Sequence, residues 1–97
     1  MSSVIEEAVA AIQAKLGDGF DGAAKFVIEG EGAVLVDGGG VRAGDDSDEA
    51  DVTMTADVDT FRDILSGDLN PTSAFMGGKL KVDGDMGTAM KLGSALS

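Results

Sequence analysis

The sequence contains no cysteine, no histidine, no tryptophan and no tyrosine, and it has a single proline among its 97 residues. The lack of cysteine excludes disulfides, thiolate zinc sites and thiol nucleophiles. The lack of histidine removes the commonest general base and metal ligand, so Ser-His-Asp and Cys-His catalytic arrangements cannot form. We therefore predict that the chain is not an enzyme and that it uses no metal and no cofactor.

Positive charge is also scarce. Seven Lys and Arg side chains stand against 18 Asp and Glu side chains, which gives a formal net charge of −11 at pH 7. Such a field repels nucleic-acid phosphates and disfavours standing attachment to anionic membranes, so we expect no nucleic-acid partner. The balance resembles that of halophilic proteins from a high-salt cytoplasm, and an ordinary acidic bacterial protein is the alternative.

Long apolar runs are missing as well. No run in the sequence approaches the roughly 18–20 apolar residues that span a bilayer. Residues 1–7 lack the basic and apolar regions of a signal peptide, so we expect a cytoplasmic chain without stable membrane insertion. The length predicts one domain over residues 1–97, and with aromatic residues at 4% its core must be built from aliphatic side chains and methionine.

Three patterns that could suggest a ligand fail. The acidic run Asp45-Asp46-Ser47-Asp48-Glu49 has no apolar shelter that would raise a carboxyl pKa, so a solvated loop that attracts cations weakly is the better interpretation. Asp83-Gly84-Asp85 begins like an EF-hand loop, but glycine, threonine and serine occupy the later positions that need an oxygen ligand, glycine and glutamate. Gly38-Gly39-Gly40 precedes neither a helix nor a Lys-Ser/Thr pair, which predicts a turn instead of a phosphate loop.

Hydrophobic periodicity predicts the element order α-β-β-β-β-α-α-β-α. Ser3 and Glu6 have the spacing of a capping box at the start of the first helix, which Gly17 should end. Asp57, Asn70 and Asp85 are the expected N-caps of the three later helices. The expected strands cover residues 25–28, 33–36, 41–43, 51–56 and 79–82. This order predicts an α+β fold, with a five-stranded, mostly antiparallel sheet and helices packed on one face.

The segment 74–92 is unusual because it places three methionines, a phenylalanine and four glycines around one short strand. Methionine is unbranched and adaptable, and it recurs at surfaces that accommodate several apolar partners. The successive motifs Ala74-Phe75-Met76, Gly78-Lys79-Leu80-Lys81, Gly84-Asp85-Met86-Gly87 and Ala89-Met90-Lys91-Leu92 resemble the C-terminal signature of the sterol carrier protein 2 family. The resemblance is strong over residues 51–92 and weaker before them.

The resemblance implies an apolar cavity for a lipid tail, enclosed by helices and one sheet face and covered by the last helix. The matching positions are Phe75, Met76, Leu80, Val82, Met86, Ala89, Met90 and Leu92. From the strands we add Phe26, Ile28, Val34, Val52 and Met54, where a shift of one residue in register would exchange the two faces of a strand. Without the resemblance, all these side chains would be expected to fill an ordinary core. Gly77, Gly78 and Gly87 permit either close packing or a hinge, and the resemblance favours the hinge.

The leading hypothesis is therefore a monomeric, non-catalytic lipid-binding or lipid-transfer domain of low specificity. Its ligand would be a fatty acid, fatty acyl-CoA, phospholipid, sterol or isoprenoid, and Lys79, Lys81 and Lys91 could meet an anionic head group or simply keep a strand edge soluble. Because family domains also occur fused to enzymes, the alternative is an accessory module that presents lipid to a partner dehydrogenase or thiolase.

Two features of the sequence refine this hypothesis. The chain is short for the family, which predicts a smaller lid or a shallower cavity. Residues 95–97 do not match a peroxisomal address, which favours a prokaryotic cytosolic member, and the acidic charge balance favours a haloarchaeal one. An empty pocket of about 300–500 Å³ would cost roughly 7–12 kcal/mol, so we expect the free protein to collapse partly or to loosen its last helix.

Overall fold

The computed structural model describes residues 3–17, 20–44 and 49–96, and these residues form four helices and one five-stranded sheet. The helices are α1 (Ser3–Leu16), α2 (Val58–Ser66), α3 (Pro71–Met76) and α4 (Met86–Leu96). The strands are β1 (Ala24–Ile28), β2 (Gly32–Asp37), β3 (Gly40–Gly44), β4 (Val52–Ala56) and β5 (Lys81–Gly84). The element order is the predicted one.

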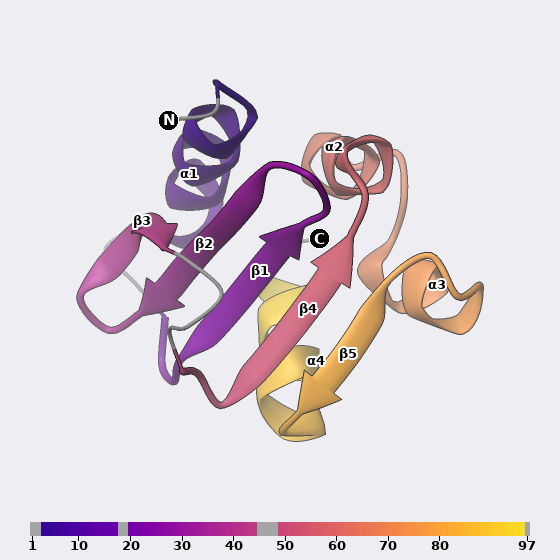
Figure 1. The fold of residues 1–97 in the computed structure, drawn as a ribbon. Helices are drawn as coiled ribbons and strands as arrows, with labels where there is room; N and C mark the ends of the chain where they lie inside the picture. Colours follow the sequence, from indigo (N-terminus) through magenta and orange to yellow (C-terminus); the bar gives the residue numbers. More distant parts are fainter. Residues whose placement is uncertain (1–2, 18–19, 45–48, 97) are drawn as a thin grey trace.

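The sheet has the strand order β3-β2-β1-β4-β5, as Figure 1 shows. The pairings β1–β2, β2–β3 and β4–β5 are antiparallel, whereas β1 and β4 run parallel, with Phe26 beside Met54. The sheet is therefore mixed, and the predicted α+β class with a mostly antiparallel sheet is confirmed. The parallel pair places the N-terminal meander and the C-terminal half of the chain side by side.

One face of the sheet carries the core. Alternate residues of the central strands point to this face, and all four helices contribute side chains to the same buried cluster. In Figure 1, α4 lies behind β1, β4 and β5, whereas α3 lies beside the β5 edge. Phe26 of β1 meets Phe61 of α2 edge to face, with ring centroids 5.0 Å apart. This layered arrangement confirms the expectation that helices cover one sheet face.

Local sequence signals set most of the helix ends. Gly17 adopts φ +67° after α1, and its N–H bonds to the Gln13 carbonyl at 2.8 Å. The Asp57 carboxylate accepts from the Thr60 N–H at 2.7 Å, and the Asn70 side chain accepts from the Thr72 N–H at 2.8 Å. The predicted caps of α2 and α3 are thus confirmed. Helix α1 differs slightly, because it begins at Ser3 itself and not after it.

The fifth strand is displaced from its predicted position. Residues 81–84 form β5, two residues later than the expected range of 79–82. The N–H groups of Lys79 and Leu80 both bond to the Ala74 carbonyl, at 2.9 and 3.1 Å. Because this carbonyl ends α3 and engages both donors, pairing with β4 starts only at Lys81. The predicted acidic loop covers residues 45–49, of which 45–48 lie outside the described residues.

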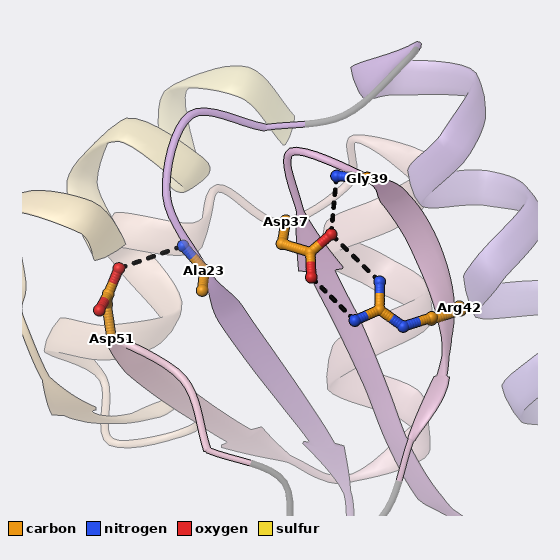
Figure 2. A network of polar contacts seen from close by, with 5 residues as sticks. All are labelled: Ala23, Asp37, Gly39, Arg42 and Asp51. Atoms are coloured by element: carbon orange, nitrogen blue, oxygen red, sulfur yellow. Dashed lines mark hydrogen bonds and ion pairs between the residues drawn. The ribbon is translucent and has the colours of Figure 1, made fainter.

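Two aspartates organise the strand ends (Figure 2). Asp37 accepts two hydrogen bonds from the Arg42 guanidinium, at 2.8 and 3.1 Å, and one from the Gly39 N–H at 2.8 Å. These bonds hold the pKa of the Asp37 carboxyl below its usual range. They also close the β2–β3 turn, which was predicted from the glycine run at residues 38–40. Asp51 accepts from the Ala23 N–H at 3.2 Å, which ties the start of β4 to that of β1.

Candidate functional site

An apolar groove lies between α3, α4 and the β4–β5 edge of the sheet. Its volume is about 270 Å³. The lining residues come from all four of these elements and from the turn before β5: Met54, Pro71, Thr72, Phe75, Met76, Leu80, Val82, Met86, Ala89, Met90 and Gly93. No charged side chain is found among the described residues of this lining. Thr72 supplies its single side-chain hydroxyl.

The groove gathers the exposed large apolar side chains of the described residues. Four large apolar side chains are exposed in the described part of the chain, and all four line the groove. Their exposed fractions are 42% for Phe75, 81% for Met76, 44% for Met86 and 71% for Met90. Apolar residues gathered in this way, instead of scattered singly, mark a binding surface. The arrangement therefore favours an apolar guest over catalytic chemistry.

Helix α3 forms one wall, and its first turn and its buried side are held in place. Asn70 caps its first turn, and Pro71 occupies the first helical position. Ala74 is fully buried, so the helix is held against the core on that side. Phe75 and Met76 are left at the groove, beyond the buried alanine. The cap and the small buried residue thus orient α3, while its large side chains stay free to contact a ligand.

Helix α4 forms the opposite wall. Asp85 caps it, because its carboxylate accepts from the Gly87 N–H at 3.1 Å and from the Thr88 hydroxyl at 2.6 Å. These bonds hold the pKa of the Asp85 carboxyl below its usual range, the Thr88 bond being the larger cause. The predicted cap is thereby confirmed. Ala89 is 6% exposed and faces both core and groove, whereas Met90 lies on the groove side.

The thirteen predicted lipid-binding residues divide into two groups. Eight of them line the groove: Met54, Phe75, Met76, Leu80, Val82, Met86, Ala89 and Met90. The other five are buried in the core and do not line the groove: Phe26, Ile28, Val34, Val52 and Leu92. The four strand residues of this group lie in the core cluster with residues of α1, α2 and α4, and Leu92 lies on the buried side of α4. The groove meets the sheet only at Met54 and Val82. Contact of either group with a lipid stays a prediction.

Three lining residues were not predicted. Pro71 and Thr72 precede Phe75 by four and three residues, and Gly93 follows Met90 by three, so each lies on the same helical face as a predicted residue. Helical spacing could therefore have found them. An added Cβ on Gly93 would lie 3.7 Å from the Pro71 Cβ, which shows how closely α4 approaches α3 at this point.

The three candidate hinge glycines have different backbone roles. Gly77 ends α3 with ordinary right-handed angles, and Gly87 lies in the first turn of α4. Gly78 has φ +78° with nothing within 4 Å of an added Cβ, so the turn itself requires glycine there. A hinge at these positions stays a prediction. All three lie where a groove wall meets a connecting segment.

The three lysines near the motif do not line the groove. The Lys91 ammonium lies 3.6 Å from the Asp21 carboxylate. Hydrogen bonds to Thr60 lower the pKa of Asp57, and the charge of Lys79 adds a smaller effect. Lys81 points away from the groove, because Leu80 and Val82 on either side of it line that surface. Because none of the three lines the groove, their contact with an anionic head group stays a prediction.

A second hollow of about 360 Å³ lies between α1 and α2. It is larger than the groove, but Glu7 and Arg62 line it and form an ion pair with 3.0 Å between Nη2 and Oε2. None of the four exposed large apolar residues lines it. We therefore assign the candidate site to the groove.

Within the described residues, no cluster of three or more acidic side chains is placed to hold a metal ion, and no helix is long and apolar enough to cross a membrane.

Solved structures share this fold. A sterol carrier protein 2-like 2 from Aedes aegypti superposes with a TM-score of 0.77 over 95% of both chains, at 24% identity. The sterol carrier protein 2 of the same insect, determined as a complex with the C16 fatty acid palmitate, has a TM-score of 0.73 over 100% of both chains, also at 24% identity. Identities this low show a common fold and leave ligand and function to other evidence.

Sequence relatives are more similar but much longer. The hydroxysteroid dehydrogenase-like protein 2 of Xenopus laevis is 43% identical over 96 residues, which cover 93% of this chain and 21% of the relative. The human protein of that name is 53% identical over 55 residues, which cover 57% of this chain and 13% of the relative. The chain thus spans about a fifth of the frog protein. Residues 6–97 match the sequence profile of the SCP-2 sterol transfer family, and the chain belongs to that family.

Proposed function

We propose that this chain binds the apolar tail of a lipid in the groove between α3, α4 and the β4–β5 edge. One observation carries the proposal: the exposed large apolar side chains of the described residues all line this one groove, which has no charged residue in its lining. Burial of apolar surface contributes about 25 cal/mol per Å², so covering these side chains is favourable without any polar recognition. The selectivity expected from such a surface is low.

The family and the fold support a fatty acyl chain as the first ligand to test. The sterol carrier protein 2 of Aedes aegypti was solved with palmitate, and it shares the fold of this chain over its whole length. The groove volume of about 270 Å³ is slightly below the roughly 300 Å³ at which drug-sized ligand sites begin. The proposal therefore includes widening of the groove on binding, by movement of the methionine side chains and of α4, which would then cover the tail.

Displacement of a fluorescent fatty acid by palmitate tests the proposal directly. Met90→Glu would place a charge against the bound tail, and we expect the affinity to fall by more than about tenfold because an unpaired charge is costly to bury. Ala95→Glu is the matched control, since Ala95 is an exposed residue of the same helix that does not line the groove. Equal affinities of the two variants, or no displacement by any apolar ligand, would contradict the proposal.

Thermal unfolding gives an independent measurement. A ligand present at 100 times its Kd stabilises the folded state by about 2.7 kcal/mol. For a domain of this length, that corresponds to a rise in Tm of roughly 10–20 °C. An unchanged Tm at saturating palmitate would argue against specific binding to the folded protein.

A second candidate function is that of an accessory module that presents lipid to an enzyme. The observation that favours it is the length of the relatives: this chain matches a fifth of a dehydrogenase-like protein in Xenopus laevis. A dehydrogenase-like partner from the host should then co-purify with this chain in a fixed ratio and turn over a lipid substrate faster in its presence. A turnover rate that does not respond to the chain would leave free carriage as the function.

A further inference from the structure

Four of the five methionines in the sequence line the groove, and the fifth, Met1, lies outside the described residues. Their exposed fractions differ strongly: 81% for Met76, 71% for Met90, 44% for Met86 and 3% for Met54. Three sulfur-bearing side chains are thus open to solvent around a buried fourth. Thioether sulfur is the softest nucleophile in this chain, because the sequence has no cysteine.

We propose that Met76 and Met90 are oxidation sites for hydroperoxides, and that their conversion to methionine sulfoxide lowers lipid binding by the groove. The inference rests on the proposed function for its consequence, but not for the modification itself. In the step, the thioether sulfur attacks one peroxide oxygen and the S–O bond forms as the O–O bond breaks. Sulfur loses two electrons to hydrogen peroxide, the second peroxide oxygen leaves as hydroxide, and the proton of the transferred hydroxyl passes to it to give water.

The positions of the two residues explain why oxidation would act on binding. Met76 stands at the end of α3 and Met90 on α4, so they approach a bound tail from opposite walls. A sulfoxide is a polar acceptor, and the Thr72 hydroxyl is the one side-chain donor in the described lining. A lipid tail that covered the sulfoxides would remove their hydration without supplying donors. The bound state would therefore be weakened selectively.

The folded state should tolerate the same modification. In the free protein both side chains face solvent, so their sulfoxides stay hydrated and no core contact is lost. Met54 provides the contrast, because it is buried between β1 and β5 and its oxidation would place an oxygen in the core. The proposal thus separates a loss of affinity at Met76 and Met90 from a loss of stability at Met54.

Site-resolved peptide mass spectrometry during treatment with hydrogen peroxide tests the modification. We expect Met76 and Met90 to oxidise first, Met86 next, and Met54 at least about tenfold more slowly in the folded protein. Palmitate should slow oxidation of the exposed residues by covering them. Oxidation of Met54 at the rate of Met76 would overturn the proposal, whatever the outcome of the binding assays.

Affinity before and after peroxide tests the consequence. Wild-type protein with Met76 and Met90 fully oxidised should bind palmitate about tenfold more weakly at an unchanged Tm, and a methionine sulfoxide reductase should restore the affinity. The variant M76L/M90L should give the same affinity before and after treatment, and M54L should respond as the wild type does. Unchanged wild-type affinity after full oxidation would overturn the proposal. Absence of binding in untreated protein would instead refute the proposed function. The order of oxidation would still be tested by the mass spectrometry alone.

Discussion

The β3-β2-β1 half of the sheet and the β4–β5 edge bury apolar residues in different ways. Under α1, the core consists of branched aliphatic side chains, and Ile12, Val34 and Val36 are at most 1% exposed. At the other edge, α3 and α4 present Phe75 and three methionines that stay between 42% and 81% exposed. The first region is built from branched side chains with few favoured rotamers, whereas the second carries unbranched methionines that can adapt.

The difference shows how one small domain combines a uniquely packed core with an adaptable apolar surface. Branched side chains lose little rotamer freedom on packing and specify a unique core. Methionine has three rotatable bonds, so a surface that contains it can fit guests of several shapes. In α4 both kinds of position occur within three residues, since Leu92 is fully buried and Met90 is 71% exposed. Substitutions in α4 therefore test the difference between core and groove most directly.

The largest effect is expected from Leu92→Ala. Removal of this fully buried side chain should lower the free energy of unfolding by about 2–5 kcal/mol, because it leaves a cavity beneath α4. Met90→Ala on the same helix should change it by less than about 0.5 kcal/mol and weaken lipid binding instead. Urea unfolding of both variants measures the contrast. Equal losses of stability would show that the groove side of α4 is part of the core.

The next effect concerns the backbone that anchors α4 to the sheet. Gly84 has φ +112°, and an added Cβ would collide with the Asp51 carbonyl and lie 3.0 Å from the Val52 Cα. The contact is this close because the Asp85 N–H bonds to that same carbonyl at 2.8 Å. Gly84→Ala should therefore cost about 2–4 kcal/mol of stability.

Gly78→Ala is the matched control for this prediction. Gly78 also has a positive φ, of +78°, but an added Cβ would meet nothing within 4 Å. The cost should be about 1–2 kcal/mol, from backbone strain alone. If the two alanine variants unfold at the same urea concentration, the close approach at Asp51 does not limit the β5–α4 junction.

Features that depend on neighbouring residues could be predicted from the sequence. The caps at Asp57, Asn70 and Asp85 are local, since each side chain reaches an N–H two or three residues along. The parallel pairing of β1 with β4 could not be predicted, because it joins segments 28 residues apart and leaves no local pattern. The start of β5 was missed because a carbonyl outside the strand, that of Ala74, takes the N–H groups of Lys79 and Leu80.

The candidate site shows the same limit. Phe26, Ile28, Val34 and Val52 lie in the core cluster that the helices cover. Alternation cannot show which helix covers each position, so it could not separate the groove from the core beneath α1 and α2. Segment 74–92 was more informative, because methionines at helical spacing next to a glycine-rich turn are unusual for a tightly packed core. Seven of the eight groove residues that were predicted lie in this segment.

A smaller effect is expected from the charge of the α4 cap. The hydrogen bonds to Asp85 lower its pKa in the folded state, so the carboxylate stabilises the fold at pH values above its unfolded pKa of about 3.9. This contribution is lost as the pH falls through the lower, folded pKa. Asp85→Asn keeps a capping oxygen but removes the charge, and its stability should therefore fall less steeply than that of the wild type below about pH 4.

The measurement is the urea midpoint between pH 7 and pH 2.5. Asp83→Asn serves as the matched control, because it makes the same change in net charge at a residue that does not cap α4. If Asp85→Asn and the wild type lose stability in parallel throughout this range, the bonds to Gly87 and Thr88 do not depend on the charge.

The smallest effect should come from Arg62→Met, in the half of the molecule that holds the second hollow. Arg62 and Glu7 join α2 to α1, but their side chains are 56% and 63% exposed. Exposed ion pairs contribute little because water screens them, so the stability should change by no more than about 0.5 kcal/mol. The affinity for palmitate should not change, since neither residue lines the groove. A change in affinity larger than that of Met90→Ala would move the lipid site from the groove to the hollow between α1 and α2.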